Sequence, residues 1–265
     1  MPITRRDMLA TTLAAGASST IGAAAETTKS SYYELRHFQL RTDNNEQGQG
    51  RRTGAFLSGA YVPAAKRAGA GPIGLFSAQI APSMPFMICL TSYPSLAAME
   101  AAREKFAADA DYQKALADYD SPAAPAYDGM ESWVLRAFDF FPAIELLPPD
   151  PKRPARLFEM RTYESANQTL MQRKIKMFGS GEVGIFRRVG LQPVWFGEAI
   201  AGSKLPHITY MVAFENLAAR EKNWVGFGSD PEWVKLRSTP EFAVPPLVSN
   251  ISNAILSPLN GSDIR

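Results

Sequence analysis

An internal repeat constrains the fold of this chain more than any other feature of its sequence. The segment Tyr33–Phe38 matches Phe158–Tyr163 at an offset of about 125 residues, and further along the offset settles at about 121. At that second offset the matched pairs are Arg67 with Arg188, Gly69 with Gly190, Phe106 with Phe227, Asp109 with Asp230, and Tyr112 with Trp233. A steady offset through the same order of elements indicates a duplicated module.

Each copy has the pattern of a β-α-β-β-α-β unit. In the second copy, hydrophobic periodicity predicts strands at Arg156–Tyr163, Pro193–Ile200, Ile208–Phe214 and Asn250–Leu256, and helices at Ala166–Val189 and Leu217–Arg237. Glycines at Gly179–Gly181 predict a kink in the first of these helices, and Gly228–Pro231 predicts a break in the second. In the first copy the same pattern predicts strands at Tyr32–Leu40, Ile73–Ile80, Phe86–Tyr93 and Glu131–Phe140, and helices at Arg51–Ala68 and Ser95–Tyr119.

This element order is the split β-α-β arrangement of ferredoxin-like α+β folds. We expect one module at residues 30–141, a proline-rich linker at 142–155, and a second module at 156–259. A sheet of this kind carries helices on one face, so its other face needs a cover. Two copies in one chain can cover each other, which predicts an intramolecular α/β barrel.

The first 25 residues have the composition of an export signal rather than of a folded segment. Arg5 and Arg6 precede an uncharged stretch, Met8–Ala25, that ends in three alanines. This pattern is typical of a bacterial twin-arginine signal peptide, with cleavage after small residues. The stretch is too rich in Gly, Ser and Thr for a good membrane span. We therefore expect a periplasmic or secreted protein without a stable membrane span once the signal is removed.

Composition narrows the range of partners. A net charge of +2, with basic and acidic residues mixed along the chain, disfavours nucleic acid as a partner. The single cysteine, Cys89, excludes an internal disulfide and lies in an apolar run that favours a core position. No metal-ligand spacing, phosphate loop or dinucleotide motif is present, so we expect no metal site.

Two segments of the second copy resemble the NIPSNAP family. Phe158–Tyr163 has the Glu-x-Arg-x-Tyr pattern of the opening NIPSNAP strand, and Trp224–Trp233 is similar to that family's second helix. The first copy is divergent, since Arg103 stands in place of Trp224 and Ala110–Tyr112 in place of Pro231–Trp233. The resemblance implies a dimeric α/β barrel fold, a superfamily that includes cofactor-free monooxygenases, haem-handling enzymes and isomerases. It does not imply one defined reaction.

The opening strand of the second copy carries the first candidate site. Strand alternation puts Glu159, Arg161 and Tyr163 on one face, and the first copy repeats this with Glu34, Arg36 and Phe38. Arg161 could hold an anionic or carbonyl-bearing ligand, oriented by Glu159. The alternative is a structural ion pair that locks strand to helix or copy to copy, and its occurrence in both copies favours that alternative.

The two histidines, His37 and His207, are the other polar candidates. Imidazole can ligate haem or shuttle a proton near neutral pH, but a lone histidine is more often a plain core or surface residue. We name His207 and Glu159 as the candidate catalytic residues. We expect no bound cofactor, since nothing beyond a lone histidine indicates haem.

Aromatic residues concentrate in the second copy and suggest a flat apolar pocket between its sheet and second helix. The alternative is ordinary core packing, which is favoured because the spacings fit buried strand and helix faces. In the pocket interpretation, Trp195 and Tyr210 are walls on neighbouring strands, and Arg161 or His207 is the polar anchor. The predicted ligand-binding set is Arg161, Tyr163, Trp195, Tyr210 and Trp224.

Three functions fit these observations. The first is a small-molecule binding protein of the cell envelope that takes an apolar or aromatic ligand. The second is a cofactor-independent monooxygenase or isomerase, which needs an apolar pocket and one acid–base residue. The third is a structural or interaction protein that assembles into homo-oligomers through exposed apolar faces.

Overall fold

The computed structural model describes residues 29–42, 48–120, 125–148 and 154–265. The strands are β1 (Tyr32–Gln39), β2 (Ile73–Ile80), β3 (Phe86–Tyr93), β4 (Gly129–Ala137), β5 (Leu157–Glu164), β6 (Gln192–Ala201), β7 (His207–Phe214) and β8 (Asn250–Pro258). The α-helices are α1 (Gln49–Phe56), α2 (Val62–Arg67), α3 (Leu96–Ala108), α4 (Ala110–Tyr119), α5 (Gln168–Met177), α6 (Val183–Arg188), α7 (Leu217–Ser229), α8 (Pro231–Arg237) and α9 (Pro240–Ala243).

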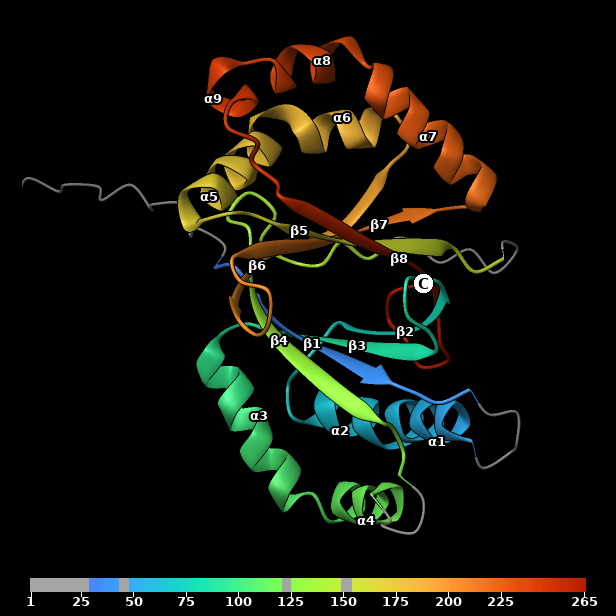
Figure 1. The fold of residues 1–265 in the computed structure, drawn as a ribbon. Helices are drawn as coiled ribbons and strands as arrows, with labels where there is room; N and C mark the ends of the chain where they lie inside the picture. Colours follow the sequence, from blue (N-terminus) through green and yellow to red (C-terminus); the bar gives the residue numbers. More distant parts are fainter. Residues whose placement is uncertain (1–28, 43–47, 121–124, 149–153) are drawn as a thin grey trace, which may run out of the picture.

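The eight strands close into one antiparallel barrel in the order β1-β3-β2-β8-β5-β7-β6-β4. Each copy supplies four neighbouring strands, and the copies join where β2 pairs with β8 and β4 pairs with β6. Helices α1–α4 cover one side of the strands and α5–α9 cover the opposite side (Figure 1). The predicted fold of two ferredoxin-like modules packed as an intramolecular α/β barrel is confirmed.

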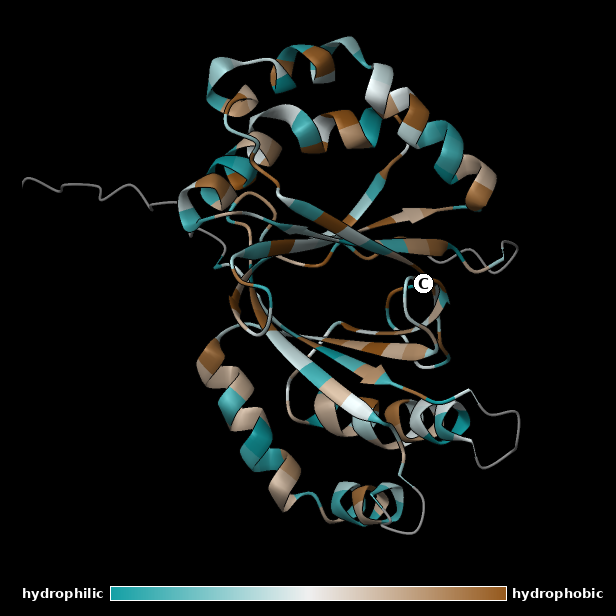
Figure 2. Ribbon diagram, in the orientation of Figure 1, coloured by the Kyte–Doolittle hydropathy of each residue, from teal (hydrophilic) through white to brown (hydrophobic). Residues whose placement is uncertain are grey.

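Strand alternation divides the apolar residues into an interior core and two outer cores. Tyr33 and Leu35 of β1 and Phe158 and Met160 of β5 point into the barrel, where they join one buried cluster. The opposite faces of the sheets pack on the helices in one separate cluster for each copy. Hydrophilic and hydrophobic residues accordingly alternate along the helices (Figure 2).

The first helical segment of each copy contains a π-helical turn, η1 (Leu57–Tyr61) and η2 (Phe178–Glu182). Gly181 within η2 has a φ of 148°, so the predicted kink is confirmed, and glycine tolerates this angle without steric cost. A buried ion pair spans the turn, with Lys174 Nζ 2.6 Å from Glu182 Oε2. The turn in the first copy contains Gly59, which has no positive φ, and we did not predict this turn.

The second helical segment is broken in both copies. The predicted break in the second copy is confirmed, since α7 ends at Ser229 and α8 begins at Pro231, with the Asp230 carboxylate accepting from the first free N–H groups of α8. In the first copy we predicted one helix over Ser95–Tyr119, which is wrong. Asp109 caps α4 in the same way and interrupts the helix there.

Two further predictions fall outside the described residues. The proposed signal at residues 1–25 lies wholly outside them, and the predicted linker lies partly outside them, at residues 149–153. Within the described ranges, no helix combines the length and apolar character needed to cross a membrane.

Candidate functional site

Both histidines of the chain point into the barrel at the same end. At this end β1, β2, β5 and β6 finish and the other four strands begin, and we call it the histidine end. His37 lies near the end of β1, and His207 is the first residue of β7. Their interior neighbours on β5 and β7 are also polar, namely Thr162 and Thr209, so a polar layer caps the apolar interior core.

A pocket of about 170 Å³ opens at the histidine end. Its walls are mostly apolar and come from both copies, with Phe86 and Trp133 from the first and Met160 and Ala254 from the second. Its polar side chains include those of His37 and Thr162. The hairpin between β2 and β3 closes one side through Ala81, Pro82 and Ser83. A cavity of this size matches a single six-membered ring, since engineered apolar cavities of about 150 Å³ bind benzene.

His37 forms one wall of this pocket. Its ring lies 4.2 Å from the Phe86 ring, centroid to centroid. Within the described residues, no side chain forms a hydrogen bond with the His37 imidazole. Burial lowers the pKa of His37 below 6.5, and the Glu131 carboxylate only partly opposes this effect. The imidazole is therefore neutral at pH 7, with one N–H donor and one acceptor nitrogen.

His207 lies behind the pocket and is fully buried. Its Nδ1 is 3.3 Å from Thr209 Oγ1, which is 3.0 Å from the Oγ1 of Thr162 on the pocket wall. The Trp133 ring packs against it with centroids 4.9 Å apart, and Nε2 has no hydrogen-bond partner within the described part of the chain. Burial lowers the pKa of His207 as well, so this imidazole is also neutral at pH 7.

The hairpin between β6 and β7 holds Trp133 in place. Trp133 Nε1 donates to Ser203 Oγ at 3.1 Å, and Ser203 Oγ donates to Glu131 Oε2 at 3.3 Å. Gly202, with a φ of 133°, lies so close that a Cβ there would be 2.5 Å from the indole. The hairpin of one copy thus fixes a pocket wall supplied by the other.

The predicted Glu159–Arg161 pair exists, but it lies outside the barrel, between β5 and α7. Glu159 is fully buried and accepts five hydrogen bonds, from Arg161 (2.6 Å), from Asn253 (2.9 Å), from Trp224 (2.8 Å) and twice from Arg220 (2.8 and 2.9 Å). These contacts tie β5 to β8 and α7, as expected for a structural ion pair that locks strand to helix.

The remaining predicted ligand-binding residues separate into two groups. Tyr163, Tyr210 and Trp224 lie beside Arg161, where Tyr210 donates to the Tyr163 hydroxyl at 2.7 Å and Trp224 lies under the guanidinium. Their proposed role in binding stays a prediction. Trp195 lies elsewhere, packed against Tyr33 in the barrel interior.

We expected Trp195 and Tyr210 to be two walls of one pocket, and this is wrong. A register shift in β6 pairs Trp195 with Met211, which faces the barrel interior, and pairs Phe196 with Tyr210, which faces the helices. Directly paired residues share a face of the sheet, so Trp195 and Tyr210 point in opposite directions.

In the first copy, the same positions form a looser arrangement. Glu34 is 3.6 Å from Arg103, and Ser132 donates to it at 3.4 Å. Arg36 lies 4.1 Å over the centre of the Tyr61 ring, and its Nε has no partner among the described residues. The predicted repetition of the Glu and Arg positions is real, but the tight ion pair is present in the second copy only.

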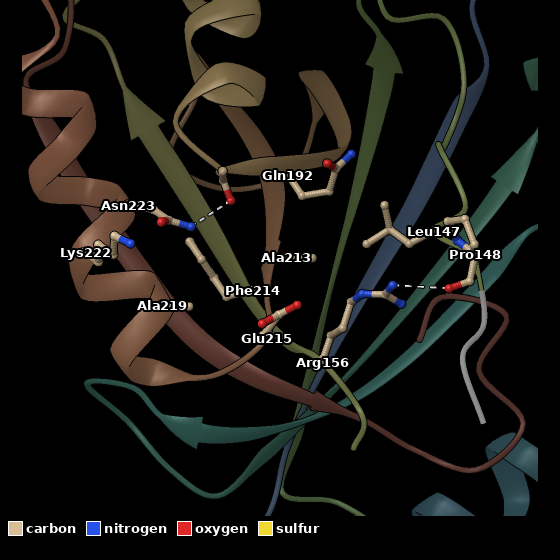
Figure 3. A pocket seen from close by; sticks show the side chains of 11 residues that line it. Leu147, Pro148, Arg156, Gln192, Ala213, Phe214, Glu215, Ala219, Lys222 and Asn223 are labelled. Carbon is tan, nitrogen blue, oxygen red and sulfur yellow. Dashed lines mark hydrogen bonds between the residues drawn. The ribbon is translucent and has the colours of Figure 1, made fainter. Parts of the chain in front are cut away.

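Two wider grooves lie at the opposite end of the barrel. Figure 3 shows one of them, of about 490 Å³, between β7, α7 and the chain near Leu147. Two of its polar side chains already serve the fold, because Arg156 donates to the Pro148 carbonyl at 3.2 Å and Asn223 donates to the Gly190 carbonyl at 2.8 Å. The other, of about 720 Å³, lies beside Tyr32 and Arg136. Neither shares the apolar, ring-lined character of the pocket at the histidine end.

Fold and site together define an α/β barrel protein in which one chain supplies both ferredoxin-like halves and one end of the barrel holds a small apolar pocket. The NIPSNAP family model matches residues 33–142 and again 158–263. The chain therefore belongs to the NIPSNAP family, with two family domains in tandem.

Two solved structures share this architecture over most of the chain. A proposed monooxygenase from Fusobacterium nucleatum matches with a TM-score of 0.53 and 10% identity, over 87% of this chain and 93% of its own. Another, from Lactobacillus acidophilus, has a TM-score of 0.53 and 8% identity, over 88% and 98%. A NIPSNAP family protein of unknown function from Agrobacterium tumefaciens is 21% identical over 42% of this chain and 95% of its own, with a TM-score of 0.37. Among curated proteins, none matches the chain.

Sequence reasoning did not identify Trp133, Phe86 or Thr162 as site residues. Strand alternation does place Thr162 on the same face of β5 as Phe158 and Met160. The sequence does not show which face of the strand points into the barrel, so the inward position of Thr162 could not be predicted. Trp133 lies in the first copy, whereas the aromatic residues that suggested a pocket lie in the second copy.

Proposed function

We propose that this protein binds a small apolar or aromatic molecule, about the size of one ring, in the pocket at the histidine end. The observation that carries the proposal is the pocket itself, where Phe86, Trp133 and Met160 surround about 170 Å³ of space. Its polar lining residues are His37, Thr162, Ser83, Ser252 and Asn253. Few well-placed polar groups in an apolar cavity are typical of small-molecule sites.

The surroundings of the pocket suit an apolar ligand. Several exposed large apolar side chains belong to strand ends and hairpins of the histidine end, namely Ile80, Met84, Met130, Ile200, Leu205 and Ile251. Burying a ring that exposes roughly 200 Å² contributes on the order of 5 kcal/mol before the entropic cost of association, so we expect binding no tighter than a Kd of about 0.2 mM.

Toluene titrations followed by NMR test this proposal. Ala254 lines the pocket and is buried, and Ala254→Leu should fill the space and weaken toluene binding at least tenfold. The size-matched control is Ala97→Leu on the exposed surface of α3, which should leave binding unchanged. Equal toluene affinity in both variants would show that the ligand does not bind in this pocket.

A second candidate function is cofactor-independent oxidation or isomerisation of such a ligand. Two structural neighbours are described as proposed monooxygenases, and a neutral imidazole at position 37 could act as a general base. Oxygen uptake with single-ring phenols tests it. The candidate predicts uptake that His37→Gln abolishes while toluene still binds, and no uptake by the wild type would exclude monooxygenation of these phenols.

We also propose that residues 1–25 direct export by the twin-arginine route, on the strength of Arg5, Arg6 and the small residues that precede Glu26. N-terminal sequencing of protein recovered from a periplasmic fraction tests this. Intact protein recovered from the cytoplasm alone would argue against it.

A further inference from the structure

We propose that the Thr162 hydroxyl, backed by Thr209 and His207, is a fixed hydrogen-bond donor that selects single-ring ligands carrying a carbonyl oxygen. This inference rests on the proposed function, because it names the chemistry of the ligand that the same pocket takes. It also assigns His207 the role of a positioning residue that acts through two hydroxyl groups without touching the ligand.

The three side chains form one buried polar run in an otherwise apolar interior. Thr162, Thr209 and His207 are all less than 5% exposed. Oxygen and nitrogen atoms follow one another at 3.0 and 3.3 Å, from Thr162 Oγ1 to Thr209 Oγ1 to His207 Nδ1. One end of the run is Thr162, on the pocket wall, and the other is the buried His207 Nε2.

Counting protons along the run gives it a direction. The two threonines and a neutral imidazole have three hydrogens to donate, and the run itself uses two of them. The third hydrogen must lie at one end. It is either on His207 Nε2, which has no partner among the described residues, or on Thr162, where a ligand in the pocket can accept it.

The cost of an unmade hydrogen bond decides between these two ends. A buried N–H without an acceptor is rarer and costlier than a buried lone pair without a donor. The Trp133 ring beside His207 carries no acceptor except its π system, which is weak. Backbone groups of Ser203 and Ile208 lie near the imidazole and partly oppose the lowering of its pKa, but Nε2 makes no hydrogen bond within the described residues. The favoured tautomer therefore carries its proton on Nδ1. His207 then donates to Thr209, Thr209 donates to Thr162, and Thr162 donates into the pocket.

The pocket geometry restricts what can accept this hydrogen. The cavity holds about one ring. Near Thr162 its walls are the apolar side chains of Met160 and Ala254 and the hydroxyl-bearing Ser252, which pairs with Thr162 from β8, and no cationic side chain lines it among the described residues. An anion would face desolvation there without a cation, whereas a neutral carbonyl oxygen needs only one donor. We therefore infer a neutral aldehyde or ketone on a single ring as the ligand class.

Two isosteric ligands test the donor by NMR titration. Cyclohexanone and methylenecyclohexane have similar shapes, but only the ketone carries an acceptor oxygen. Thr162→Val should weaken cyclohexanone binding about fivefold to tenfold and leave methylenecyclohexane within twofold of the wild type. Thr162→Ser, which keeps the hydroxyl, should restore ketone binding. Thr91→Val is the control, because Thr91 is a buried threonine that hydrogen-bonds Tyr61 away from the pocket.

The outcomes separate this inference from the proposed function. Binding of both ligands with no difference between wild type and Thr162→Val would overturn the donor role and leave the pocket intact. Failure of both ligands to bind the wild type would overturn the pocket and the donor together. A separate readout needs no ligand. Imidazole ¹⁵N shifts should show His207 protonated on Nδ1, and protonation on Nε2 would overturn the proposed direction.

Discussion

The buried carboxylate of Glu159 offers the sharpest test of how this fold is stabilised. Glu159→Gln keeps the size of the side chain but removes its charge. The carboxylate has no exposed surface and accepts five hydrogen bonds, including two from Arg220 and one from Arg161. After the substitution both guanidinium groups keep their charge next to a neutral amide, whose NH₂ group cannot accept.

The expected cost is about 3–5 kcal/mol, the range found when one partner of a buried ion pair is removed. For a chain of this size, that corresponds to a fall in Tm of roughly 6–20 °C. Urea and thermal unfolding followed by circular dichroism measure it. The matched control is Glu34→Gln at the equivalent position of the first copy, where Arg103 is 3.6 Å away and more than half exposed. There the loss should stay below about 1 kcal/mol.

The stabilisation by the Glu159 carboxylate should also depend on pH, in a direction that its pKa predicts. Burial alone would raise the pKa of Glu159, but hydrogen bonds from Arg220, Asn253 and Trp224 and the charge of Arg161 outweigh it and lower the pKa. The stabilisation is therefore complete at neutral pH and is lost as the pH falls through the lowered pKa. The gap between wild type and Glu159→Gln should narrow in acid. Equal costs for the variants at positions 159 and 34, or a gap that widens in acid, would refute the argument.

Three further predictions concern the pocket and the core. Because burial lowers the pKa of His37, toluene binding should be flat from pH 7 upward and weaken in acid below an ordinary imidazole pKa of about 6.5, and His37→Gln should remove this change in NMR titrations. Gly202→Ala should cost about 1–3 kcal/mol in urea unfolding and weaken toluene binding, because the new Cβ would meet Trp133 at 2.5 Å, whereas Gly228→Ala, with open space around it, should not destabilise. Cys89 is fully buried and burial raises its thiol pKa, so a thiol-reactive dye should label it only after unfolding, and rapid labelling of the native protein would contradict this.

The repeat made the fold predictable, and strand alternation made the contents of each face predictable. Glu159, Arg161 and Tyr163 share a face as expected, and Thr162 shares the other with Met160. Alternation cannot say which face meets the helices, because a charged pair can be buried on either side once it is neutralised. The polar face turned out to lie under α7, where Arg220 supplies a second cation that the strand pattern does not reveal.

The pocket could not be predicted from the sequence, because it is built from elements that are far apart in the chain. Its walls come from β1, β3, β4, β5, β8 and the hairpin between β2 and β3, and their proximity depends on how the barrel closes. A one-residue irregularity also matters, since the register shift in β6 turned Trp195 away from Tyr210. Local periodicity carries no information about either.

Fusion of the two copies in one chain allows the two sides of this pocket to differ. The barrel has a pseudo-twofold arrangement, so in a symmetric dimer each pocket position would be occupied by the same residue twice. Here Trp133 is matched by Ala254, Phe86 by His207, and His37 by Thr162. Two tryptophans would fill the space and two alanines would widen it, whereas one of each leaves room for a ring against an aromatic wall. The same asymmetry gives the pocket one imidazole wall and one hydroxyl wall, so a ligand can bind in a defined orientation. Divergence of the copies is therefore what we expect of a barrel whose end binds one molecule. Restoring symmetry by Ala254→Trp should abolish toluene binding through lost volume, even if the barrel still folds.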